Sequence, residues 1–224
     1  MILRPHGSTR VAITQPDHAA LAGRIIGAWH ANGLLDSPRR DDILLAVAEH
    51  DNGWREIDDA LLVDPATGAI LDFMTVPAHV KRGVWSRAIA RLAATPYAAA
   101  LVAHHAGHVY SRYRSDEAWL PFFAEMDASR DRLLREAVAV TCDNLLADYV
   151  FLRIGDLASL AFCTAGTMLG GEFGYTVRLD GTLVVITPDP FEGADVPFSI
   201  DGYEIEGYTF KRRVTITGVA AGSR

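Results

Sequence analysis

The sequence predicts a mainly α protein of the α+β class: a helical bundle with a small antiparallel β-sheet formed by the N- and C-terminal segments. Two observations support this fold class. Residues 15–168 carry apolar side chains at helical spacing, whereas residues 1–14 and 170–218 alternate between apolar and polar side chains and contain hairpin signals. We therefore expect a single domain over residues 1–224. Its helical core should span residues 15–168, and its β appendage residues 1–14 and 170–218.

The chain is expected to begin with a hairpin and a helix. Residues 1–14 alternate around Gly7, and a helix should follow over residues 15–30, because Pro16 suits the first turn of a helix. The apolar residues at helical spacing from His18 are Leu21, Ala22, Ile25, Ile26 and Trp29. His18 is therefore expected on the buried face, one turn from the start of the helix.

A second helix is expected over residues 38–53. It places His50 and Asp51 on the same face as its core residues, which are Ile43, Val47 and Trp54. A buried ionised carboxylate is costly unless it is paired or bound to a cation. A bound cation would explain why both polar side chains point inward.

Two further helices carry polar side chains toward the same interior. The helix over residues 96–111 aligns His105 with an apolar stripe, and His104 lies beside it as either a second metal ligand or a hydrogen-bonding partner of a ligand. A long apolar helix is expected to break at Gly155, so that Asp156 starts the next helix. There Asp156 either caps the new helix or reaches a metal.

The C-terminal segment is expected to consist of strands. Apolar runs on both sides of Asp180-Gly181 predict a hairpin, and residues 199–205 and 211–217 have the composition of strands. The Pro- and Gly-rich loop over residues 187–198 is expected to border the cleft above the helical core.

The inward-facing polar residues predict one metal site. A single buried histidine is more often a hydrogen-bonded core residue, but separate segments that all aim histidine or aspartate inward favour a shared cation. The predicted ligands are His18, His50, Asp51, His105 and Asp156. This mixture of nitrogen and oxygen donors suits a divalent transition metal, Zn, Mn, Fe or Ni, as one or two ions. In a two-metal site Asp51 would be the natural bridge.

Several stretches of the chain resemble a known superfamily. They are residues 13–23, 50–56, 64–68, 72–73 and 156–160. Their order, His, His-Asp, His and Asp, resembles the HD superfamily of metal-dependent phosphohydrolases. Nearly the whole chain is similar to an uncharacterised bacterial HD-like family, domain of unknown function 3891. The resemblance implies an HD-domain-like helical bundle.

The resemblance also implies roles for individual residues. In the superfamily the first His, the His-Asp pair and the final Asp bind one metal, and these map to His18, His50, Asp51 and Asp156. Two-metal members add histidines between the pair and the final Asp, which here are His105 and, as an addition or alternative, His104. The doublet of histidines leaves the identity of the intermediate ligand open.

The function expected from these residues is a metal-dependent hydrolase, in particular a phosphohydrolase of a small molecule or nucleotide that uses metal-activated water. Asp51 and Arg55 are its candidate catalytic residues, and the candidate cations for substrate phosphate are Arg55, Lys81 and Arg82. Arg112 and Arg114 are more typical of surface charges. Two alternatives remain: an HD-type di-iron oxygenase, and a metal- or ligand-binding module without turnover.

The composition of the chain limits the classes of partner and substrate that we expect. With 224 residues, of which 50% are hydrophobic and 22% charged, the chain is long enough for one substantial core. A net charge of -7 argues against a surface that coats nucleic acid, so we expect a small-molecule substrate. No signal-peptide core or uninterrupted membrane span is found, and a cytoplasmic location is expected. A homo-oligomer is compatible with the sequence.

Overall fold

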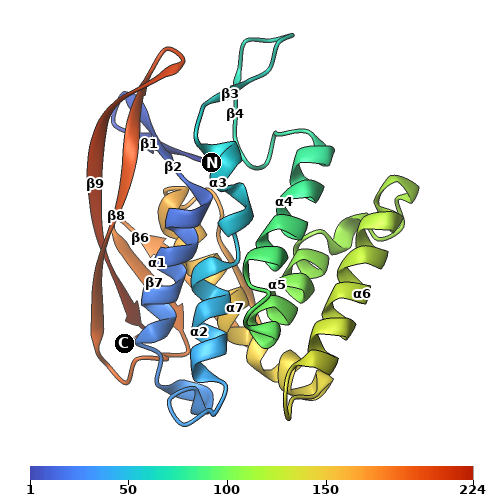
Figure 1. Cartoon of the computed structure of the whole chain (residues 1–224). Coiled ribbons are helices and arrows are strands. Elements are labelled where there is room, and N and C mark those ends of the chain that lie inside the picture. The colour runs from blue at the N-terminus through green and yellow to red at the C-terminus, as the bar shows by residue number, and fades with distance from the viewer. Residues whose placement is uncertain (224) are drawn as a thin grey trace.

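The computed structural model describes residues 1–223 as a curved sheet packed against a layer of helices (Figure 1). The α-helices are α1 (Gln15–Gly27), α2 (Arg40–Glu49), α3 (Arg55–Asp58), α4 (Ala78–Arg91), α5 (Pro96–Val109), α6 (Leu120–Glu136) and α7 (Cys142–Cys163). Short 3-10 turns are η1 (Ala31–Gly33), η2 (Asn52–Trp54), η3 (Ser111–Tyr113) and η4 (Glu117–Trp119). No helix within residues 1–223 is both long and apolar enough to cross a membrane.

The main sheet contains seven strands within the described residues, in the order β1-β2-β8-β9-β7-β6-β5. These strands are β1 (Ile2–His6), β2 (Thr9–Ile13), β5 (Gly170–Glu172), β6 (Tyr175–Asp180), β7 (Leu183–Thr187), β8 (Asp195–Glu206) and β9 (Thr209–Gly222). Neighbouring strands are antiparallel except β7 and β9, which are parallel. A separate two-stranded sheet pairs β3 (Leu62–Val63) with β4 (Ile70–Leu71).

The predicted fold class, a helical bundle with a small antiparallel sheet, is wrong. The sheet is large, mixed and curled around one side of the helices (Figure 1). The main reason is the length of β8 and β9, which have 12 and 14 residues and extend well beyond the predicted runs 199–205 and 211–217. Long strands accumulate twist, which curls a sheet of this size.

The helices meet the sheet through α1 and α7, with α2 on the next row and α4, α5 and α6 farther from the sheet (Figure 1). The predicted break at Gly155 is absent, because α7 runs without interruption from Cys142 to Cys163. A Cβ atom on Gly155 would lie 2.7 Å from Ile26 Cγ1 and 3.0 Å from Val47 Cγ1. The glycine therefore lets α7 approach α1 and α2 closely, which brings three helices together around one buried volume.

The loop between β7 and β8 closes the far end of α1. The backbone N–H of His30 donates to Pro190 O at 2.8 Å, and the ring of Phe191 contacts Trp29 with ring centroids 6.1 Å apart. These contacts hold residues 187–198 at the C-terminal end of α1. His18 lies near the opposite end of the same helix.

Candidate metal centre

His18 is placed by the first turn of α1. The Thr14 side chain caps this helix by accepting from the Asp17 backbone N–H at 3.1 Å, and Pro16 occupies the first turn. The Gln15 backbone N–H donates to Asp58 Oδ2 at 2.6 Å, which ties the start of α1 to α3. His18 is fully buried on the same face as the core residues of α1.

His50 and Asp51 lie where α2 passes into η2. Gly53 makes this position possible, because a Cβ atom there would lie 1.9 Å from the carbonyl oxygen of Val84 on α4. The Gly53 carbonyl also accepts from Arg87 Nε at 3.1 Å. The segment that carries Asp51 is therefore pressed against α4, and only glycine fits at this contact.

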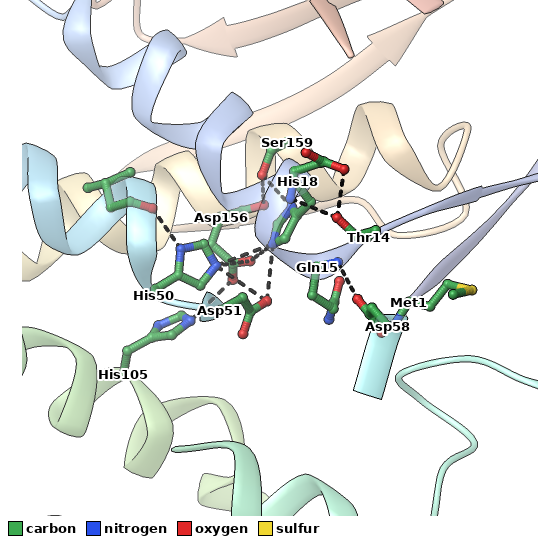
Figure 2. A network of polar contacts seen from close by, with 12 residues as sticks. Met1, Thr14, Gln15, His18, His50, Asp51, Asp58, His105, Asp156 and Ser159 are labelled. Atoms are coloured by element: carbon green, nitrogen blue, oxygen red, sulfur yellow. Dashed lines mark hydrogen bonds and ion pairs between the residues drawn. The ribbon is translucent and has the colours of Figure 1, made fainter. Parts of the chain in front are cut away.

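Acceptor atoms of four residues converge on one point (Figure 2). The Nε2 atoms of His18 and His50 are 3.2 Å apart. His18 Nε2 lies 3.5 Å from Asp51 Oδ2 and 3.4 Å from Asp156 Oδ1, and the corresponding distances from His50 Nε2 are 3.6 and 3.7 Å. Residues from α1, α7 and the end of α2 thus meet although they are far apart in the chain.

The Nδ1 atoms of His18 and His50 form hydrogen bonds outside this group of four acceptor atoms. His50 Nδ1 lies 2.8 Å from Val47 O, and a carbonyl can only accept, so Nδ1 carries the proton. Ser159 Oγ donates to Asp156 O at 3.0 Å and therefore accepts from His18 Nδ1 at 2.7 Å. Both neutral imidazoles then present an unprotonated Nε2 to the centre.

This arrangement fits a cation. Two bare imidazole nitrogens and two carboxylate oxygens face one another, and none of these four atoms can donate a hydrogen bond in the neutral-histidine state. Buried acceptors in such a cluster require either a proton or a metal ion between them. Nitrogen and oxygen donors with outer hydrogen bonds that orient the rings are typical of transition-metal sites.

His105 extends the cluster toward α5. Its Nδ1 is hydrogen bonded to the Tyr149 hydroxyl at 2.9 Å, and its Nε2 lies 3.8 Å from Asp156 Oδ2. Two groups of residues could therefore hold a metal ion: His18, His50 and Asp51, and His50, His105 and Asp156. The two oxygens of Asp156 face different histidines, with Oδ1 toward His18 and Oδ2 toward His105.

A chain of ion pairs holds Asp156 from behind. Arg153 Nη1 donates to Asp156 Oδ2 at 2.8 Å, and Arg153 Nε donates to Glu172 Oε2 at 2.8 Å. His108 Nε2 lies 2.7 Å from the other oxygen of Glu172. Strand β5, which carries Glu172, thereby fixes the orientation of the Asp156 carboxylate through Arg153.

The buried charges shift the pKa values of the cluster. Burial alone would lower the pKa of His18, but the facing carboxylates of Asp156 and Asp51 outweigh burial and raise it well above its ordinary value. Burial alone would raise the pKa of Asp156, but contacts with His18 and His50 hold it well below its usual range. Burial lowers the pKa of His105 well below its ordinary value. Without a metal, this shift favours the doubly protonated, cationic form of His18.

Metal binding is therefore expected to release a proton. A cation must displace the proton on His18, so its affinity should fall as the pH is lowered and rise as the pH approaches the raised pKa of His18. Near pH 7 we expect about one proton released per bound cation. Titration calorimetry in two buffers of different ionisation enthalpy measures this number, and a binding enthalpy independent of the buffer would contradict the expectation.

The cluster lies at the floor of a cavity of about 290 Å³. Among its lining residues, the metal-donor candidates are His18, Asp51, His105 and Asp156. Three cationic side chains also line it: Lys81, Arg112 and Arg153. The remaining lining residues are Gln15, Trp54, Phe73, Met74, Trp85, Val109, Tyr110, Leu160 and Met168. An acidic protein therefore has a locally basic cavity above its buried acceptors.

Other predicted residues do not line this cavity. Arg55 and Arg82 are not among the lining residues. Arg55 forms an ion pair with Glu49 at 3.0 Å, and Arg82 donates to the carbonyl of Ala118. His104 packs edge to face against Tyr149 with ring centroids 4.5 Å apart, and burial lowers its pKa to about 4. The loop over residues 187–198 does not border the cavity, because it packs at the other end of α1.

Two polar lining residues near the donor cluster, Arg153 and Gln15, were not among the predicted site residues. Arg153 lies three residues before Asp156, which places both side chains on one helix face. Gln15 was treated as part of a helix start, although it lies three residues before His18. The same spacing argument that placed the histidines would have found both. Arg112, which was assigned to the surface, lines the cavity.

Comparison with known proteins places the chain in a family. Residues 1–212 match the family described as "Protein of unknown function (DUF3891)". The chain belongs to the DUF3891 family. No curated protein and no solved structure matches the DUF3891 chain. Evidence for the role of the buried His and Asp cluster in this DUF3891 protein therefore comes from the geometry of the cluster itself.

Proposed function

We propose that this protein is a metal-dependent phosphohydrolase of small phosphoesters. One observation carries the proposal: the acceptor atoms of buried imidazoles and carboxylates converge at the floor of a cavity that cationic side chains line. The order of these residues along the chain, which resembles the HD superfamily, supports the same chemistry. Zn, Mn, Fe and Ni are the metals that suit this donor set, as one or two ions.

The metal would be held by His18, His50, Asp51, His105 and Asp156. When bound, such a cation polarises a phosphoryl oxygen and lowers the pKa of a coordinated water toward neutrality. Asp51, which lines the cavity with 6% of its surface exposed, would accept a hydrogen bond from the attacking water and orient it.

Cationic side chains would bind the phosphate. Arg153 is fixed beside Asp156 by Glu172, so its guanidinium is held in place before substrate arrives. Lys81 and Arg112 enter the cavity from α4 and η3. Their positive charges favour an anionic substrate and would stabilise the charge that develops on the phosphoryl oxygens during hydrolysis.

Metal dependence is the test of this function. Protein purified without a His tag should contain a transition metal, lose hydrolysis of p-nitrophenyl phosphate after chelation, and regain it when Zn, Mn, Fe or Ni is added. Metal content by mass spectrometry and release of p-nitrophenol measure the two outcomes. Bound metal without turnover would indicate a binding module, and iron with oxygen consumption would indicate an oxygenase; either result would overturn the proposal.

A further inference from the structure

Gln15 is a buried polar residue of the cavity that the proposed reaction does not use. Its side chain lines the cavity, and only 3% of the residue is exposed. The carbonyl oxygen of this side chain has no hydrogen-bond partner within residues 1–223. A buried amide oxygen without a partner costs free energy, so its position calls for a donor that is supplied from elsewhere.

The backbone fixes the point from which this side chain starts, close to the proposed metal donors. The Gln15 backbone N–H is fixed by Asp58 at 2.6 Å, and Pro16 follows in the first turn of α1. Gln15 lies three positions before His18, so both side chains lie on one face of the helix, with their Cβ atoms roughly 5–6 Å apart. In Figure 2 the Gln15 side chain lies on the Asp51 side of α1, and both residues line the cavity. A ligand group that meets it lies close to the reacting centre.

We propose that Gln15 selects substrates whose alcohol part carries a hydroxyl group near the phosphate. This inference rests on the proposed function. Substrate ammonium groups are disfavoured, because Lys81, Arg112 and Arg153 already line the cavity and would repel a further positive charge. A neutral hydroxyl is the donor that fits. The volume of about 290 Å³ suits a small polyol phosphate better than a large ligand.

Matched phosphoesters test the selection. Wild-type protein loaded with metal should hydrolyse 2-hydroxyethyl and 3-hydroxypropyl phosphate with kcat/KM at least about tenfold above ethyl and propyl phosphate, because a site built around a hydrogen bond rejects analogues that lack the donor. Gln15→Met removes the amide while keeping the side-chain length, and should abolish this preference. Met168→Leu changes an apolar wall of the same cavity and should retain it.

Binding of phosphonates separates this inference from the proposed function. 3-Hydroxypropylphosphonate and propylphosphonate replace the ester oxygen with carbon, so they cannot be hydrolysed at that bond. Calorimetry should show at least about tenfold tighter binding of the hydroxylated compound to wild type, and no preference in Gln15→Met. Selective binding of the hydroxylated phosphonate without hydrolysis of the esters would support the role of Gln15 and overturn the proposed hydrolase function.

Other results would overturn the inference. If wild type and Gln15→Met prefer the hydroxylated compounds equally, Gln15 does not recognise the hydroxyl group. Failure of wild type to bind any phosphonate would remove the anionic ligand on which the inference depends. Loss of metal from a Gln15→Met protein that keeps its melting temperature would assign Gln15 to the metal donors.

Discussion

Replacing Asp51 with alanine is expected to cause the largest loss of activity. The Asp51 carboxylate faces the Nε2 atoms of His18 and His50 at 3.5 and 3.6 Å. In the proposed mechanism the variant therefore loses one metal donor and the acceptor for the attacking water. A loss of about 4 kcal/mol of transition-state stabilisation corresponds to roughly a thousandfold fall in kcat/KM. Turnover of p-nitrophenyl phosphate and metal content by mass spectrometry measure the effect.

Asp59→Ala is the control for this prediction, because Asp59 is an exposed carboxylate eight positions later, directly after α3. It should retain metal and turnover. The circular dichroism spectrum should show that Asp51→Ala remains folded. Full metal content together with unchanged kcat/KM in Asp51→Ala would exclude Asp51 from the donors and from the reaction.

Gly53→Ala is expected to cause the largest loss of stability. The new Cβ atom would lie 1.9 Å from Val84 O, 2.9 Å from Val84 C and 3.0 Å from Ala88 N. These are backbone atoms of α4, so the helix itself must move. We expect the free energy of unfolding to fall by about 3 kcal/mol, at the upper end of the usual cost of overpacking. Urea unfolding measures this change.

Gly27→Ala provides the matched substitution, because a Cβ atom on Gly27 meets nothing within 4 Å at the end of α1. Its free energy of unfolding should be unchanged or higher by up to about 1 kcal/mol. Gly53→Ala should also weaken metal binding, since Asp51 lies two residues away on the displaced segment. Similar stability of the two variants would show that the contact between η2 and α4 is not tight.

Local periodicity was enough to place the histidines of the candidate site. His18 and His105 lie on the apolar faces of α1 and α5, His50 directly follows α2, and all three are buried. Helical spacing is a local property, so it can be read without knowledge of the partners. The orientation of Asp156 was harder to assign, because a glycine inside an apolar helix signals either a break or a close approach. At Gly155 it is the close approach to Ile26 and Val47.

Sheet size could not be deduced in the same way. Strand β2 pairs with β8 at Arg10 and Ile205, positions that are far apart in the chain, and such pairing leaves no local signal. The exposed half of β9 contains charged residues, which obscure the alternation at its start. Side-chain roles within the cavity, such as that of Arg153, depend on partners from another element and therefore require the three-dimensional arrangement.

The cavity lies apart from the sheet, and this separation affects how well the chain should tolerate substitutions in its strands. Within the described residues, no strand contributes to the cavity lining, and the sheet reaches the donors through Glu172 and Arg153. Substitutions on the outer face of β8 and β9 should therefore alter solubility or stability while leaving the chemistry intact. The strands offer a surface that evolution or a protein engineer can redesign, with Glu172 as the position to preserve.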